Sequence, residues 1–185
     1  GKLTVTQRAV TVTVNGASRA YGDENPAFTA AVTAGTLAGG DTVASLGLAL
    51  TTTADTASPV GSYDVTGTAG NGNYAVTVDG TGKLTVTQRA ITVTAENQSS
   101  RVNRDLADLT YTYAPALVGS DAFTGKLATD ADKTTAGNYT ITQGTLALNG
   151  NYAITFNKGT YTVRNKLEQD GFRFDGGQSA LTKTY

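Results

Sequence analysis

A repeat with a period of about 80 residues is the feature that most limits how this chain can fold. The decapeptide GKLTVTQRAV at residues 1–10 returns as GKLTVTQRAI at residues 82–91, with nine identities in ten positions. A weaker third copy, GTYTVRNK, occupies residues 159–166. Such a period is longer than the repeating unit of most solenoids and suits a small globular domain. The chain is therefore expected to contain consecutive copies of one domain.

Two further landmarks keep the same order in both copies. VGSYDVTGT at residues 60–68 is answered by AGNYTITQGT at 136–145, and NGNYAVTV at 71–78 by NGNYAITF at 149–156. These matches predict four segments: the final strand of a truncated upstream module at residues 1–8, a first module at 9–88, a second module at 89–165, and a C-terminal segment of different composition at 166–185.

The joint between the two modules has no linker rich in proline, glycine or serine, because TVTQR at residues 85–89 runs directly into AITVTA at 90–95. We expect the last strand of one module to continue almost straight into the first strand of the next, which would limit bending and produce a rod. Residues 82–94 are expected to be paired strands. Residues 1–8, as an orphan strand, are expected to seek an edge on another molecule.

Alternation of apolar and polar residues predicts β-strands throughout both modules. In LTVTQ, VTVTV, NYAVTV, NYTIT and NYAITF, every second residue is apolar or aromatic, which places these residues on one buried face. The 22 glycines and the many β-branched residues agree with strands and turns. We predict an all-β fold of two β-sandwich-like, Ig-like modules end to end, with a β-grasp-like sheet carrying one short helix per module as the alternative.

Local signals predict hairpin turns and two short helical stretches. The pairs that accept positive φ, as a type I′ turn requires, are Asn15-Gly16, Asn71-Gly72 and Asn149-Gly150. The only plausible helical stretches are residues 37–47 and 117–125, where Asp41 and Asp121 could cap a turn. No helix longer than two turns is expected.

Short motifs recur at a regular order and spacing in the two modules. In the first module they are Tyr21-Gly22 with Asn25-Pro26, Gly40-Asp41, Gly61-Ser62-Tyr63, Asn73-Tyr74 and the closing GKLTV at 82–86. The second module retains Asp121, Gly137-Asn138-Tyr139 and Asn151-Tyr152. It departs at its start, where Val102-Asn103 and Leu106-Ala107 replace Tyr21-Gly22 and Asn25-Pro26. We therefore expect its first turn to have a different shape.

This series of motifs resembles the MBG family, the mostly-β, glycine-rich repeats found in tandem in large bacterial adhesins and filamentous-haemagglutinin-like exoproteins. The resemblance implies a secreted or cell-surface protein that promotes attachment or biofilm formation, commonly exported by two-partner secretion or as an autotransporter. It implies no catalytic residue. The expected role is a structural stalk or spacer. The alternative is that the modules themselves bind exopolysaccharide or a host or cell-surface protein.

Residue types leave little for catalysis. The chain has no His and no Cys, on which acid-base and nucleophilic catalysis most depend. The close carboxylates Asp23-Glu24 and Asp130-x-Asp132 lie in loop contexts where solvated turn residues are the ordinary explanation. They could hold Ca²⁺, although no D-x-[DN]-x-[DN]-G loop is present. We predict no enzyme, no catalytic or metal-binding residue and no cofactor.

Two further sequence features bear on stiffening and on ligand contact. An intramolecular isopeptide bond needs a buried acid, and the three glutamates lie in segments expected to be exposed: Glu24, Glu96 and Glu168. Tyr63, Tyr74, Tyr139 and Tyr152 recur at equivalent places in both modules, which favours core positions. Tyr111 and Tyr113 share one strand face and have no aromatic counterparts in the first module. They are the predicted contact residues for a sugar or a protein.

The charge and hydropathy of the chain limit the classes of partner that we expect. The formal net charge is −1, from 14 basic and 15 acidic residues that form no block, so no nucleic-acid partner is expected. No run approaches 18 apolar residues, so no membrane insertion by this segment is expected. Residues 1–10 lack the regions of a signal peptide, and we expect the sequence to be part of a longer exported chain. Neighbouring repeats of the same chain remain an expected partner.

Overall fold

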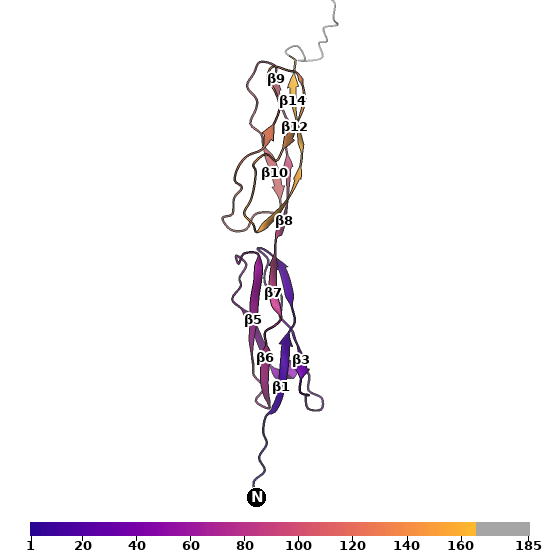
Figure 1. Cartoon of the computed structure of the whole chain (residues 1–185), viewed down its shortest axis with the longest axis vertical. Coiled ribbons are helices and arrows are strands. Elements are labelled where there is room, and N and C mark those ends of the chain that lie inside the picture. Colours follow the sequence, from indigo (N-terminus) through magenta and orange to yellow (C-terminus); the bar gives the residue numbers. More distant parts are fainter. Residues whose placement is uncertain (166–185) are drawn as a thin grey trace, which may run out of the picture. The chain divides into compact units, whose positions relative to one another are not determined.

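The computed structural model describes residues 1–165, which form fourteen β-strands and one short 3₁₀ helix (Figure 1). The predicted all-β fold in two tandem modules is confirmed. The chain divides into two compact units. Unit 1 comprises Gly1–Arg89 with the short segments Leu117–Asp121 and Asn149–Ala153, and unit 2 comprises Ala90–Ala116, Ala122–Leu148 and the described residues from Ile154 onward.

The strands of residues 1–88 form two sheets. One sheet has the order β3-β1-β6, and the other has the order β2-β7-β5-β4. The strand bounds are β1 (Arg8–Val14), β2 (Ala17–Ala20), β3 (Ala30–Ala34), β4 (Leu48–Thr52), β5 (Gly61–Ala69), β6 (Tyr74–Asp79) and β7 (Lys83–Thr87).

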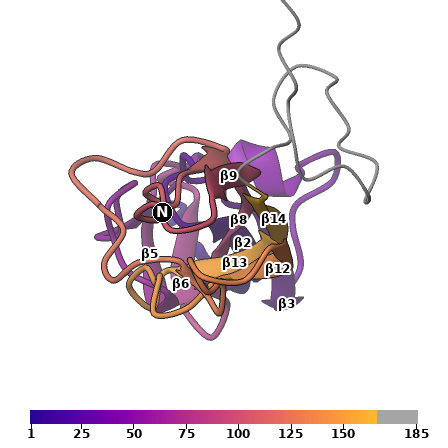
Figure 2. The same cartoon turned by 90° about the horizontal axis from the view of Figure 1, so that it is seen from above.

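The strands from residue 89 onward repeat the same topology. Their sheets have the orders β10-β8-β13 and β11-β12-β14-β9, which match the first pair strand for strand. In Figures 1 and 2, β12 and β14 lie side by side, in agreement with their antiparallel register. The strand bounds are β8 (Arg89–Ala95), β9 (Gln98–Arg101), β10 (Tyr111–Ala114), β11 (Ala128–Thr129), β12 (Gly137–Thr142), β13 (Tyr152–Asn157) and β14 (Gly159–Arg164).

The period-2 alternation of the sequence becomes a buried face in each sheet. In β1 the residues Val10, Val12 and Val14 are at most 3% exposed, and Leu84 and Val86 of β7 are equally buried. These strands contribute to two neighbouring clusters of apolar side chains within unit 1. In unit 2 the buried apolar residues from the corresponding strands are Ile91, Val93, Ala95, Ile141, Tyr161 and Val163. Each unit therefore has a core of its own.

In the first module β1 runs parallel to β6, and β2 runs parallel to β7, so the break between β1 and β2 lies next to the break between β6 and β7. β1 pairs with β6 from Arg8↔Tyr74 to Thr13↔Asp79, and β2 pairs with β7 from Ala17↔Leu84 to Ala20↔Thr87. At this break the backbone of Gly82 lies close to that of Val14. A Cβ on Gly82 would lie only 1.9 Å from the Val14 carbonyl oxygen. Only glycine fits this close approach.

The Asn-Gly prediction is wrong. Asn15-Gly16 connects β1 to β2, which pair with different strands, and Asn71-Gly72 likewise connects β5 to β6. None of the three Asn-Gly pairs has a positive φ angle. In the turn before β6, Asn71 instead accepts a hydrogen bond from the Asn73 amide on its side-chain oxygen (2.9 Å). The side chain of asparagine, rather than its tolerance of left-handed φ, explains its place here.

The helix prediction holds for the first stretch and fails for the second. Residues 43–46 form the 3₁₀ helix η1 (Val43–Leu46), seen as a coil in Figure 2, and Thr42 rather than Asp41 is its N-cap. Residues 117–125 contain no helix. There the chain turns at Gly125, which has a positive φ, and Thr124 forms an isolated bridge to Ala147.

Three further predictions concerned the two ends of the chain and the first turn of the second module. Residues 1–7 form no strand within the described residues, and Leu3 is 92% exposed. The predicted C-terminal segment of different composition, residues 166–185, lies outside the described residues. The expected change of the first turn of module 2 is wrong: Asn103 adopts a φ of 64°, close to that of Gly22. Asparagine tolerates this left-handed region, so the turn is retained.

No helix among the described residues has the length and hydropathy to cross a membrane.

Candidate functional site

Tyr111 and Tyr113, the predicted contact residues, form an aromatic cluster with Phe123 within unit 2. The ring centroid of Phe123 lies 5.3 Å from that of Tyr111 and 5.0 Å from that of Tyr113, both in edge-on geometry. The two tyrosine rings are 6.4 Å apart and tilted by 44°. Tyr113 is 46% exposed, whereas Tyr111 is half-buried. We call these three side chains the aromatic patch.

The phenol oxygens separate the aromatic patch from the other described tyrosines. Six tyrosines use their hydroxyl in a hydrogen bond to a protein atom: Tyr21, Tyr63, Tyr74, Tyr139, Tyr152 and Tyr161. Within residues 1–165, neither Tyr111 nor Tyr113 has such a partner. A tyrosine whose hydroxyl has no protein partner and whose ring is accessible can stack on a sugar and form a hydrogen bond with it.

Strand pairing explains why the patch is specific to the second module. In β10, Tyr111 is paired with Ala95 and Tyr113 with Val93. The matching positions in β3 are Ala30 and Val32, paired with Val14 and Val12. Ala30 and Val32 pack against the apolar core of unit 1. The aromatic residues therefore occupy core-facing positions but are too large to be covered fully. Their part in binding stays a prediction.

A repeated Tyr–Asp pair ties together two loops in unit 1. Tyr74 Oη donates a hydrogen bond to Asp41 and accepts one from the Ala38 amide (2.8 Å). Tyr152 Oη does the same with Asp121 (2.7 Å) and the Val118 amide (2.8 Å). Asp41 and Asp121, expected as helix caps, are thus acceptors for buried phenols.

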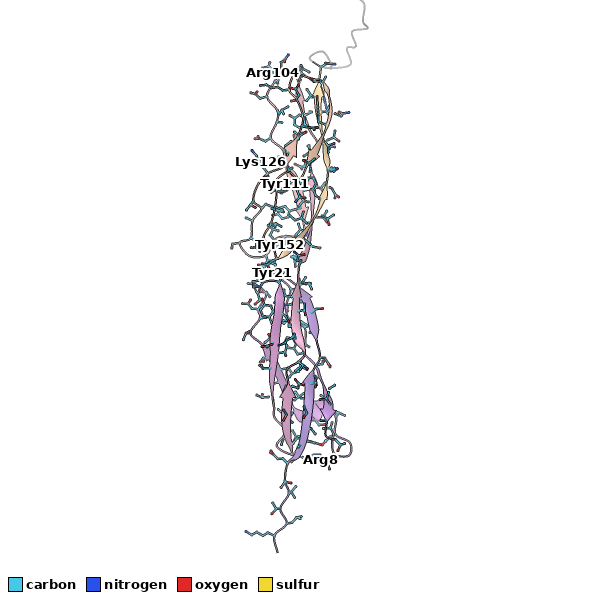
Figure 3. The ribbon with its side chains drawn as sticks, in the orientation of Figure 1. Arg8, Tyr21, Arg104, Tyr111, Lys126 and Tyr152 are labelled. Atoms are coloured by element: carbon cyan, nitrogen blue, oxygen red, sulfur yellow. The ribbon has the colours of Figure 1, made fainter. Side chains whose placement is uncertain are left out.

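A second phenol reaches Asp121 within unit 1. Tyr21 Oη donates to Asp121 Oδ2 (3.0 Å), and its ring lies edge-on to Tyr152 at 5.5 Å, as Figure 3 allows the reader to follow. Arg89 closes this cluster by binding the Tyr21 carbonyl (3.3 Å) and the Asp23 carboxylate (2.9 Å). Burial and the neighbouring Asp121 carboxylate raise the pKa of Tyr21. Sequence reasoning missed this use of the Tyr-Gly motif.

A buried arginine was also missed. Arg19 is only 7% exposed; its Nε donates to the side-chain oxygen of Asn25 (2.7 Å), and its guanidinium also binds the carbonyls of Ala20 and Asp55. Ser100 takes the equivalent position in β9, and its hydroxyl is buried without a partner among described residues. The loss of Asn25-Pro26 in the second module therefore accompanies the loss of the arginine that Asn25 binds.

The carboxylate candidates are dispersed. Asp23 pairs with Arg89, and Glu24 and Glu96 are exposed as expected, while Glu168 lies outside the described residues. Asp132 accepts hydrogen bonds from the Thr134 hydroxyl and amide, which hold the pKa of its carboxyl below the usual value. Among residues 1–165, no three His, Cys, Asp or Glu side chains are placed to hold a metal ion.

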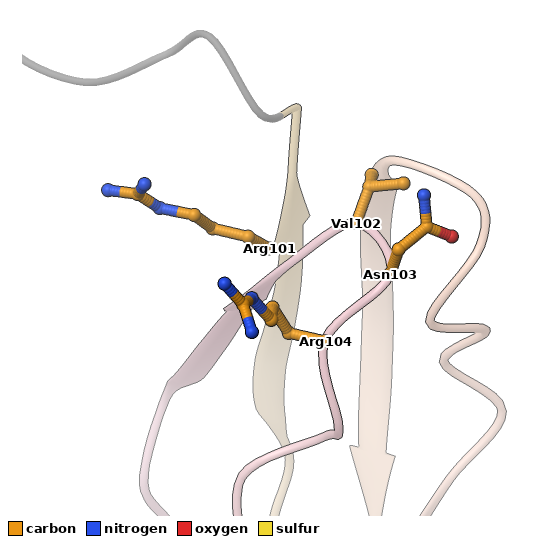
Figure 4. A pocket seen from close by; sticks show the side chains of 4 residues that line it. All are labelled: Arg101, Val102, Asn103 and Arg104. Atoms are coloured by element: carbon orange, nitrogen blue, oxygen red, sulfur yellow. The ribbon is translucent and has the colours of Figure 1, made fainter.

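A small basic hollow lies at the first turn of the second module. Arg101, Val102, Asn103 and Arg104 line a cavity of about 230 Å³, and the two arginine side chains extend to the same side of the ribbon (Figure 4). Neither arginine forms an ion pair within the described part of the chain; the ion pairs there involve Lys83, Arg89 and Lys133.

The family model described as the MBG domain of the YGX type matches two segments, residues 10–85 and 91–162, which together cover most of the chain. No curated protein matches.

Proposed function

Because this chain belongs to the MBG domain family, of the YGX type, we propose that it is a stalk segment of a secreted or surface-bound bacterial adhesin. Its repeats would hold a binding region away from the cell and withstand tension, thereby promoting attachment or biofilm formation. The observation that supports this proposal is the parallel pairing of the first two strands of the repeat with its last two strands, β1 with β6 and β2 with β7.

In the first module, the chain enters at β1 and leaves at β7. Because β1 pairs parallel with β6 and β2 pairs parallel with β7, the entry and exit points lie at opposite ends of these two consecutive strand pairs. Tension between them acts along the strands, so the inter-strand hydrogen bonds are loaded together in shear. An antiparallel hairpin pulled from its open end breaks its bonds one after another.

The second module repeats this arrangement at its far end. β9 pairs parallel with β14, from Gln98↔Tyr161 to Arg101↔Arg164. β14 derives from GTYTVRNK, the third copy of the repeated strand, and takes the same central place in its sheet as β7. Two copies with one strand order and one shear geometry are what a mechanical repeat requires.

Single-molecule force spectroscopy tests this proposal. The chain has no cysteine, so handles can be attached at introduced cysteines alone. Ala9→Cys in β1 with Thr87→Cys in β7 loads the parallel pairs β1–β6 and β2–β7 in shear. Ala49→Cys with Thr68→Cys pulls apart the antiparallel pair β4–β5, in which these residues are opposite each other. All four positions are exposed. We expect a rupture force several-fold higher for the first pair, and equal forces would refute the mechanical role.

Small-angle scattering of the full chain tests extension separately. A stalk predicts an elongated profile, and a compact globular profile would rule out the rod.

A second function, carbohydrate binding by the modules, is favoured by the aromatic patch, with its accessible Tyr113 ring and with two phenols that have no hydrogen-bond partner within residues 1–165. Titration with exopolysaccharide fragments would measure it. Binding that is lost in Tyr111→Ala or Tyr113→Ala and retained in Tyr139→Phe, a control distant in sequence and bonded to Thr135, would replace the spacer role with a ligand-binding role. Absence of binding would leave the stalk.

A further inference from the structure

Unit 1 contains the Tyr–Asp loop pair twice, and only one of the two is covered. Residues 117–121 and 149–153 are covered by the loop Tyr21–Asp23, through the contacts of Tyr21 with Asp121 and Tyr152. The second pair, residues 37–41 and 71–74, surrounds the first residues of β1. Within the described residues no Tyr-Gly loop lies on it.

The two loop pairs accept equivalent hydrogen bonds from the Gln-Arg dipeptide that precedes or begins the adjoining strand, with lengths that agree to within about 0.1 Å. Gln7 Nε2 donates to the Gly72 carbonyl at 2.9 Å, as Gln88 Nε2 donates to the Gly150 carbonyl at 3.0 Å. The Arg8 amide donates to the Asn73 carbonyl at 3.0 Å, as the Arg89 amide donates to the Asn151 carbonyl at 2.9 Å. The uncovered pair therefore holds Gln7 and Arg8 as the covered pair holds Gln88 and Arg89.

The two loop pairs differ in the groups that the Tyr-Gly loop would use. Asp121 Oδ2 accepts from two phenols, those of Tyr152 and Tyr21, whereas the Asp41 carboxylate accepts from one phenol, that of Tyr74, within residues 1–165. The guanidinium of Arg89 binds Asp23, whereas that of Arg8 turns to Thr36 (3.1 Å). Among the described residues Asp41 thus has room for a second phenol, and the Arg8 guanidinium forms no ion pair and is bonded through Nη1 to Thr36.

We propose that this surface, formed by Arg8, Ala38–Asp41 and Asn71–Tyr74 and called the base, docks the Tyr-Gly-Asp loop of another unit of the same type. The incoming tyrosine donates to Asp41 and lies edge-on to Tyr74, and the incoming aspartate pairs with Arg8. The residue after the incoming tyrosine is expected to be glycine, because Gly22 has a φ of 86° in the covered pair and this left-handed conformation favours glycine.

The occupant is a unit joined ahead of β1 rather than a free second copy. The Tyr-Gly-Asp loop of unit 1 is already engaged, so another copy of this chain offers no free one. Residues 1–7 have the same sequence as residues 82–88, which include β7. Yet Leu3 and Val5 are 92% and 86% exposed, whereas Leu84 and Val86 are 0% and 1% exposed. Burying them in a preceding unit would bring that unit's loop to the base.

A chain extended by a duplicate of residues 9–81 placed before residue 1 tests the inference. Residues 1–8 then supply the last strand of the added unit. We expect Tyr21→Phe in the added unit and Asp41→Asn to be coupled by about three- to tenfold in the unfolding equilibrium constant. The established pair, Tyr21 of the original unit with Asp121, is the positive control. The added Tyr21→Phe with Asp121→Asn is the negative control.

Hydrogen exchange gives a second readout. In the extended chain, the amides of residues 38–41 and 71–74 are expected to exchange more slowly than in the original chain. A folded added unit with no coupling to Asp41 and unchanged exchange would overturn the proposal. An added unit that stays unfolded would overturn it as well, since docking at the base is expected to stabilise that unit. The force measurement is independent of these outcomes, because it loads only the original unit.

Discussion

The phenol of Tyr74 donates a hydrogen bond to the carboxylate of Asp41 while the backbone amide of Ala38 donates to the same phenol oxygen at 2.8 Å. The tyrosine is only 4% exposed, so this oxygen is satisfied by the protein and not by bulk water. The bonds tie the loop before η1 to the start of β6. Tyr152 and Asp121 repeat them.

Removal of one phenol hydroxyl is expected to destabilise unit 1. Tyr152→Phe leaves the Val118 amide without its acceptor and removes one donor from Asp121, which should cost about 1–3 kcal/mol. Chemical denaturation followed by circular dichroism would measure the loss. Tyr139→Phe removes a bond to the Thr135 carbonyl in an exposed setting and should cost less. Equal losses would contradict the role given to the Tyr–Asp pair.

Stability is expected to fall in alkali. The pKa values of Tyr21 and Tyr152 are raised chiefly by burial, and that of Tyr74 chiefly by its hydrogen bond to Asp41. The folded state therefore holds these protons more tightly than the unfolded state does. The stabilisation that these protonated tyrosines contribute is fully present below the unfolded pKa of about 10. It is lost as the pH rises through the pKa values of the folded state. Denaturation midpoints between about pH 8 and pH 12 would record the fall. A Tyr74→Phe, Tyr152→Phe variant should show a shallower fall.

The same substitution, made in the two copies of one heptapeptide, should destabilise the protein strongly in one copy and hardly at all in the other. Leu84→Ala empties a position that is 0% exposed and should cost about 2–5 kcal/mol. Leu3→Ala alters a residue that is 92% exposed and should change stability by less than about 0.5 kcal/mol. Thermal unfolding of the two variants would compare them. A large effect of Leu3→Ala would mean that residues 1–7 are buried in solution.

Two glycines of nearly equal φ separate backbone strain from steric contact. Gly22 and Gly40 have φ angles of 86° and 87°, but only at Gly22 would a Cβ meet another residue, Val118. Gly40→Ala should cost about 1 kcal/mol for the left-handed conformation alone. Gly22→Ala should cost more, and adding Val118→Ala should recover part of the difference. If the two single variants cost the same in denaturant unfolding, the close approach at Val118 is not real.

Much of the fold could be predicted because its signals are local. The alternation in VTVTV and NYAVTV reflects the two faces of a strand, and the strands of both modules lie where it placed them. The predictions that failed depended on which strands pair and which side chains meet in the folded chain. Asn-Gly pairs accept hairpin geometry, but the hairpin forms only if the flanking strands pair, and β1 and β2 pair elsewhere. Asp41 resembles a helix cap, yet its acceptor is taken by Tyr74, which is 33 residues away.

The candidate sites divide in the same way. The absence of aromatic counterparts for Tyr111 and Tyr113 was visible in the sequence, but their contact with Phe123 depends on the fold of the second module. Arg19 gave no sequence signal, because a charged residue is buried only where carbonyls and Asn25 converge on it.

The sequence alone determined the repeat, the strand content and the family to which the chain belongs, since each is written in local alternation and in order of motifs. The tertiary structure decided what each copy does. GKLTVTQ occurs twice: at residues 82–88 it includes the central strand β7, and at residues 1–7 it forms no strand. The two heptapeptides are identical, so the difference lies in the strands β2 and β5 that flank one copy and supply its hydrogen bonds and its apolar contacts.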